Sequence, residues 1–76
     1  MGGKCVEIYQ LRQFAAVAKT ENMTRAAQSL SMAQPAVSKT IRNLESELGA
    51  ELFERTGKGL RRTEQGDILL RYARTI

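Results

Sequence analysis

Two short stretches of this 76-residue chain carry side chains suited to contacting an extended anionic molecule. The first opens at Gln34, and Gln34, Ser38 and Lys39 follow one another at helical spacing. The second runs from residue 55 to residue 62, where basic residues occur with no acidic one between them. Glutamine can form paired hydrogen bonds with an adenine edge, whereas lysine and arginine neutralise phosphates. Recognition of a nucleic acid is therefore the chemistry that these two stretches favour.

Catalysis and metal binding find little support in the composition. There is one cysteine, Cys5, and no histidine, so a disulfide framework and a Cys/His metal cluster are excluded and the commonest general base is missing. We therefore predict no enzyme activity, no metal and no cofactor. A net charge of +4 is compatible with an anionic partner without establishing one. No apolar run could span a bilayer and no secretory leader is visible, so we expect a cytoplasmic protein without membrane contact, with Met1 to Lys4 as a tail.

A helix is expected to present the first stretch. Pro35 suits a first turn, where a missing N–H costs nothing, and Gly49 suits a helix end, so we predict a helix from about Gln34 to Leu48. Its apolar face consists of Val37, Ile41, Leu44 and Leu48. The opposite face has no carboxylate, and its residues are Pro35, Ser38, Lys39, Arg42, Asn43 and Ser46. Such a face can lie against phosphates.

Two shorter helices are expected ahead of it. Apolar residues at helical spacing predict a helix from Ile8 to Lys19, followed by a turn at residues 20–22. Thr24 is the predicted N-cap of a second helix that ends at Leu30, in which the small Ala26 and Ala27 let another helix approach closely. A break at residues 31–33 then leads into the third helix. This is the layout of a helix-turn-helix unit.

The second stretch is expected to form a β-hairpin. Residues 52–55 and 60–63 are extended candidates, and glycines within residues 56–59 tolerate the positive φ of a tight turn, although an irregular loop is the alternative. Thr63 is the predicted cap of a last helix, whose apolar stripe is Ile68, Leu69, Tyr72, Ala73 and Ile76. The predicted fold class is mostly α with a small β-hairpin: a winged helix-turn-helix with a three-helix core plus wing, followed by a further helix.

In this fold the third helix enters the major groove of double-stranded DNA. Its N-terminus favours a phosphate, Gln34 can bond adenine, and Pro35 or Ala36 can touch a thymine methyl group. Ser38 and Lys39 can reach bases or phosphates. Basic residues of the wing would hold flanking phosphates or the minor groove. The predicted DNA-contacting residues of the helices and the wing are Thr24, Gln34, Pro35, Ala36, Ser38, Lys39, Arg42, Arg55, Lys58 and Arg62.

Each feature also has a simpler interpretation. Three packed helices with a break are compatible with any small α domain, and Gln34, Ser38 and Lys39 could be an ordinary solvated face. The basic residues of the hairpin could serve solubility alone. Convergence favours DNA binding, because the polar helix face and the basic hairpin share one side if the hairpin packs behind the third helix.

The chain also resembles the LysR-type transcriptional regulators of bacteria. The motifs that carry the resemblance, in order and with the family's spacing, are Leu11-Arg12-Gln13-Phe14, Thr24-Arg25-Ala26-Ala27, Gln34-Pro35-Ala36-Val37-Ser38, Leu44-Glu45-x-Glu47-Leu48-Gly49, Leu52-Phe53-Glu54-Arg55 and Thr63-Glu64-x-Gly66. The resemblance implies a winged helix-turn-helix domain that binds promoter or operator DNA as a homodimer or tetramer. It also implies that residues matching Gln34, Pro35, Ser38 and Lys39 face the groove, while Arg55 meets the backbone.

The domain division follows from pattern and resemblance together. We predict a DNA-binding domain over residues 6–63, with the helix-turn-helix at about 23–42 and the wing at about 52–63. Residues 64–76 would begin a linker helix that pairs with its twofold mate, and the predicted dimerisation residues are Ile68, Leu69, Tyr72 and Ile76. An effector-binding domain normally follows in the family and does not fit in this length, so a small-molecule effector would act only through a domain beyond this chain.

Two departures from the family pattern matter. Ala33 stands where the family usually has serine, which removes a helix cap unless Ser31 caps a shifted start. Lys39 replaces the more usual arginine and weakens any bidentate guanine contact. The alternatives to this function are another winged-helix regulator and a protein-interaction module that acts through the last helix, with an enzyme a distant third.

Overall fold

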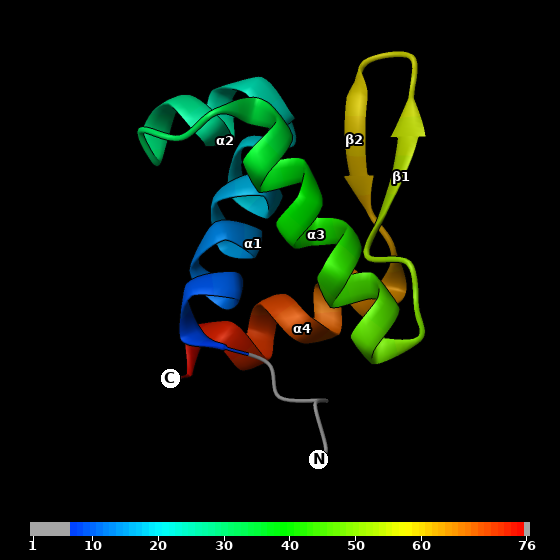
Figure 1. The fold of residues 1–76 in the computed structure, drawn as a ribbon. Coiled ribbons are helices and arrows are strands. Elements are labelled where there is room, and N and C mark those ends of the chain that lie inside the picture. The colour runs from blue at the N-terminus through cyan, green and yellow to red at the C-terminus, as the bar shows by residue number, and fades with distance from the viewer. Residues whose placement is uncertain (1–6, 76) are drawn as a thin grey trace.

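The computed structural model describes residues 7–75, which form a winged helix-turn-helix domain (Figure 1). The elements are α1 (Ile8–Thr20), α2 (Met23–Ser29), α3 (Gln34–Leu48), β1 (Phe53–Thr56), β2 (Gly59–Arg62) and α4 (Glu64–Arg74). The three helices α1 to α3 pack on one another, α4 crosses beneath α1 and α3, and the hairpin stands beside α3. The predicted fold class is confirmed. Met1 to Lys4, Cys5 and Ile76 lie outside the described residues.

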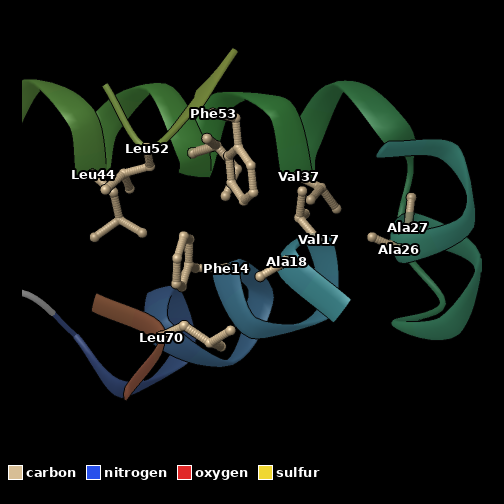
Figure 2. Packing of buried hydrophobic residues seen from close by; sticks show 11 residues of the cluster. Phe14, Val17, Ala18, Ala26, Ala27, Val37, Leu44, Leu52, Phe53 and Leu70 are labelled. Carbon is tan, nitrogen blue, oxygen red and sulfur yellow. The ribbon is translucent and has the colours of Figure 1, made fainter. Parts of the chain in front are cut away.

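Phe14 of α1 is at the centre of the core. Its side chain is fully buried, and its ring lies 5.4 Å from that of Phe53, which enters from the first strand of the hairpin. Figure 2 shows Leu70 of α4 closing the core on the other side of Phe14. The apolar face of α1, which its helical spacing creates, therefore packs against both the hairpin and α4.

The N-cap of helix α2 lies two residues earlier than predicted. Asn22, not Thr24, is its N-cap, because the Asn22 Oδ1 accepts a hydrogen bond from the Arg25 N–H at 2.9 Å. Both residue types can cap a helix, but the start at Met23 lets that side chain pack against the core. Ala26 and Ala27 are buried as predicted, so α2 lies close to α1 and α3.

Helix α3 has the predicted bounds. It starts after Ala33, which has extended backbone angles and makes no side-chain cap bond, and it ends at Gly49 with φ 67°. Ser31 has φ 56° and lies in the turn before the helix, so the alternative of a start capped by Ser31 is wrong. Leu48 is 43% exposed, which corrects its placement on the core face. Thr40 is buried instead, and its hydroxyl donates to the Ala36 carbonyl at 3.2 Å.

The hairpin is antiparallel, with Phe53 opposite Arg62 and Thr56 opposite Gly59. Gly59 has φ 134°, and a Cβ at this position would lie 2.9 Å from the Glu21 carbonyl oxygen. The Leu60 N–H donates to that same oxygen at 3.2 Å. Glycine at position 59 therefore allows the second strand to lie against the turn between α1 and α2.

Helix α4 is capped by Thr63, as predicted, through a 3.1 Å bond from the Gly66 N–H. The face turned to the core carries Gly66 and Leu70, and Leu70 was not included in the predicted stripe. Ile68 and Tyr72 are 53% and 60% exposed. The apolar stripe of this helix is therefore divided between a core face and a surface face.

Candidate nucleic-acid interface

The outer face of α3 is polar, exposed and free of carboxylates over its first two turns. Gln34, Pro35, Ala36 and Lys39 are exposed, and Ser38 is half-buried. The first turn has no side-chain cap, since Ala33 supplies none. The positive end of the helix dipole therefore faces outward without a protein anion beside it, which favours a phosphate.

Arg55 of the wing lies beside this face. It lines a hollow of about 320 Å³ together with Gln34 of α3 and Thr24 of α2. It also lines a second hollow of about 230 Å³ that it shares with Ser38 and Arg42. The hairpin thus stands beside α3, and side chains from both predicted stretches border the same two hollows.

Lys58 occupies the turn at the tip of the wing and is exposed. Its backbone N–H donates to the Thr56 hydroxyl at 3.2 Å, which shapes the turn. The turn that joins β1 and β2 lies at the end of the wing opposite α4 (Figure 1). This position suits a cation that reaches a flanking phosphate.

Arg62 differs from the other predicted wing contacts. Its Nε donates to the Asp67 Oδ1 at 2.6 Å, and its Nη1 donates to the Ala18 carbonyl at 2.9 Å. Both bonds are internal to the domain and use two of the five guanidinium N–H donors. We therefore assign Arg62 a structural contact, and its predicted phosphate contact stays a prediction.

The root of the wing is fixed to α3 by a carboxylate. The Glu45 Oε2 accepts a hydrogen bond from the Leu52 N–H at 2.8 Å. After β2, the Thr63 hydroxyl donates to the Glu51 carbonyl at 2.6 Å, and the Thr63 N–H donates to the Leu52 carbonyl at 3.0 Å. Sequence patterns did not reveal these bonds, because each joins separate segments of the chain and depends on how the elements beside them pack.

An apolar groove of about 450 Å³ lies on another part of the surface. Its residues come from the end of α3, the following loop and α4, and they are Leu48, Ala50, Leu52, Gln65, Ile68, Leu69 and Tyr72. Three of the four predicted dimerisation residues line this groove, and Ile76 lies outside the described residues. Within residues 7–75, no helix is long and apolar enough to cross a membrane.

Comparison with known families gives a match over most of the chain. The model described as bacterial regulatory helix-turn-helix protein, lysR family, matches residues 8–67. A RuBisCO operon transcriptional regulator of Allochromatium vinosum is 49% identical over 71 residues, which are 93% of this chain and 24% of that protein. The regulator PcaQ of Agrobacterium fabrum is 44% identical over 68 residues, which are 90% of this chain and 22% of that protein. The chain thus spans about a quarter of the length of these relatives.

Solved structures give the same answer for the fold. The complex of the BenM DNA-binding domain with catB site 1 DNA has a TM-score of 0.88 at 40% identity and covers 92% of this chain and 79% of that one. The complex of the CbnR DNA-binding domain with DNA has a TM-score of 0.88 at 38% identity, with coverage of 92% and 80%. The structure of CbnR, a LysR family transcriptional regulator, also has a TM-score of 0.88, but only 24% of that chain is covered.

Proposed function

This chain belongs to the LysR family of bacterial helix-turn-helix regulators, and we propose that it binds a specific sequence in double-stranded DNA as the N-terminal domain of such a regulator. The observation that carries the proposal is the position of Arg55. It borders one hollow with Gln34 and another with Ser38 and Arg42, so a groove-reading helix and a backbone-contacting wing can engage one duplex together.

The roles divide between reading and anchoring. In this proposal Gln34 reads adenine, Pro35 or Ala36 contacts a thymine methyl group, and Ser38 and Lys39 reach base edges or phosphates one turn further along. Base contacts of this kind decide which sequence is bound.

The anchors surround the reading helix. Arg42, Arg55 and Lys58 would neutralise phosphates and supply affinity for any duplex, and Thr24 at the rim of the first hollow would contact the backbone beside Arg55. Arg62 is left out of this set, because its guanidinium bonds within the domain.

We further propose that two chains pair through α4. Ile68 and Tyr72 are large apolar side chains that remain exposed, and they border the groove that also contains Leu48 and Leu69. A second copy of α4 would bury them. A homodimer or tetramer then places two reading helices on half-sites one or more helical turns apart. Response to a small-molecule effector would belong to the longer protein.

Selection of bound sequences from a random duplex pool tests the function directly. We expect one motif with two related halves, and an affinity that falls linearly with the logarithm of salt concentration, with a slope that reports several phosphate contacts. A flat salt response, or equal affinity for single-stranded RNA, would contradict the proposal. Binding to one partner protein and not to DNA would favour the interaction-module alternative.

A further inference from the structure

Arg62 is the last residue of β2, and its side chain reaches two helices. Its Nε lies 2.6 Å from the Asp67 Oδ1 in the first turn of α4, and its Nη1 lies 2.9 Å from the Ala18 carbonyl oxygen near the end of α1. Ala18 is 44 residues away in the sequence. Among the side chains of residues 7–75, Arg62 alone makes polar contacts with both α1 and α4.

The position matters because the covalent connection between the wing and α4 is short. Only Thr63 separates the end of β2 from the start of α4. Rotation about the backbone bonds of this one residue would change the angle between the wing and the helix. Arg62 spans the joint, since it belongs to the strand on one side and bonds to Asp67 on the other. A planar guanidinium held at two different nitrogens has a fixed orientation.

The contact with α1 holds the connection between β2 and α4 against the rest of the domain. The Ala18 carbonyl lies in the last turn of α1, at the negative end of the helix dipole, which favours a cation. The neighbouring turn holds the same strand again, through the 3.2 Å bond from the Leu60 N–H to the Glu21 carbonyl. The strand β2 is thereby tied to the end of α1 at two points, and α4 is tied to β2 through Asp67.

We propose that Arg62 is a positioning residue that couples the orientation of the wing to that of α4, and so selects the spacing between two half-sites on DNA. The proposal rests on the proposed function, in which the wing contacts the duplex and α4 pairs two chains. The angle between these elements then decides how far apart two bound wings lie. Side-chain exposure is 32% for Arg62 and 55% for Asp67, so the effect concerns geometry more than folding stability.

The first experiment measures the geometry without DNA. Spin labels on Lys58→Cys at the wing tip and Arg71→Cys on α4, in a Cys5→Ser background, report the distance distribution between the two elements. We expect one narrow distribution in the parent and a broader one after Arg62→Gln. Arg61→Gln is the matched control, because it removes the same charge from the adjacent exposed residue of β2 and should leave the distribution narrow.

The second experiment measures the consequence for DNA. Duplexes with two half-sites at varied separation are titrated with the parent, Arg62→Gln and Arg61→Gln. For each protein, the affinity for the duplex with the best half-site spacing is divided by the affinity for duplexes with the adjacent spacings. We expect Arg62→Gln to lower this ratio at least about fivefold, which is the lower end of ordinary coupling between two sites. Arg61→Gln should preserve this ratio. Affinity for a single half-site measures the reading function separately.

If circular dichroism shows that Arg62→Gln is unfolded, two further variants test the proposal. Arg62→Lys keeps the charge but cannot hold two acceptors with a fixed fork, and Asp67→Asn keeps an acceptor oxygen without the charge. Both should broaden the distribution, Asp67→Asn less so. Equal widths for these variants and Arg61→Gln would overturn the positioning role, whatever the DNA result. A broader distribution with an unchanged spacing profile would overturn the coupling. Failure of the parent to bind any duplex would instead refute the proposed function.

Discussion

The carboxylate of Glu45 in α3 accepts a hydrogen bond from the Leu52 N–H, at 2.8 Å, where the chain enters the wing. Leu52 is fully buried next to the core, so the bond joins the helix that carries Gln34 and Ser38 to the root of the strand that carries Arg55. A helix and a wing that contact one duplex must keep a fixed relative position. The Glu45–Leu52 bond is one of the contacts that keep it.

Glu45→Ala should lower the free energy of unfolding by about 1.5 kcal/mol, because it leaves the Leu52 N–H without its charged acceptor. Glu45→Gln retains an acceptor oxygen and should lose less. Urea unfolding of the three proteins measures both changes. The bond would be unimportant if the alanine variant were as stable as the parent.

Gln34→Ala should weaken binding to the best site by about 1–3 kcal/mol and relax the preference at one base pair. Lys58→Ala should weaken binding to all sequences alike and lower the salt slope by about one. Arg71→Ala, a charge removed from α4, serves as the control for net charge. Titrations against a panel of single-base variants at several salt concentrations separate the effects. Identical sequence profiles for the Gln34 and Lys58 variants would show that the division into reader and anchor is wrong.

Ala33→Ser should raise the free energy of unfolding by about 1 kcal/mol, because a serine hydroxyl at the N-cap of α3 can accept from a first-turn N–H. Ala33→Gly removes the side chain from the same extended position and separates the hydroxyl's contribution from backbone effects. Thermal unfolding monitored by circular dichroism measures the shift. A serine variant no more stable than the parent would count against a cap bond at this position.

Gly66→Ala should cost at least about 2 kcal/mol of stability. A Cβ at position 66 would lie 2.3 Å from the Leu52 carbonyl oxygen, which is backbone and cannot turn aside, so α4 must shift. Gly57→Ala is the matched control, since a Cβ at Gly57 meets nothing within 4 Å and should change stability by less than about 0.5 kcal/mol. Chemical unfolding of both variants tests the close approach. Similar stabilities would contradict it.

Ile68→Glu combined with Tyr72→Glu should abolish pairing and leave the fold largely intact, because both side chains are more than half exposed in the single chain. We expect the parent to be a dimer at high concentration and a mixture when dilute, and the double variant to remain a monomer. Sedimentation velocity over a concentration series measures this. Gln28→Glu, on the exposed surface of α2, controls for the added charge. Unchanged sedimentation of the double variant would show that α4 is not the contact.

The sequence by itself determined most of the elements, because their signals are local. Pro35 and Gly49 bound α3, the glycines around Lys58 mark the hairpin turn, and helical spacing places Phe14 in the core. These signals depend on the backbone preferences of single residues and on the period of a helix or strand. Neither depends on residues that are distant in the sequence. The same locality made the polar face of α3 visible as a candidate site.

Tertiary structure decided what depends on distant neighbours. Asn22 and Thr24 can both cap a helix in isolation, and in the structure Asn22 does so, with Met23 packed against the core. Leu48 and Leu70 have the same hydrophobicity, yet only Leu70 meets α1 and becomes buried. Arg62 belonged by composition to the phosphate contacts, but its partners Asp67 and the Ala18 carbonyl come together only when the strand lies against α1. A local sequence pattern identifies which polar side chains are available for a contact. Which partner each of them bonds to depends on the elements that the fold packs beside it.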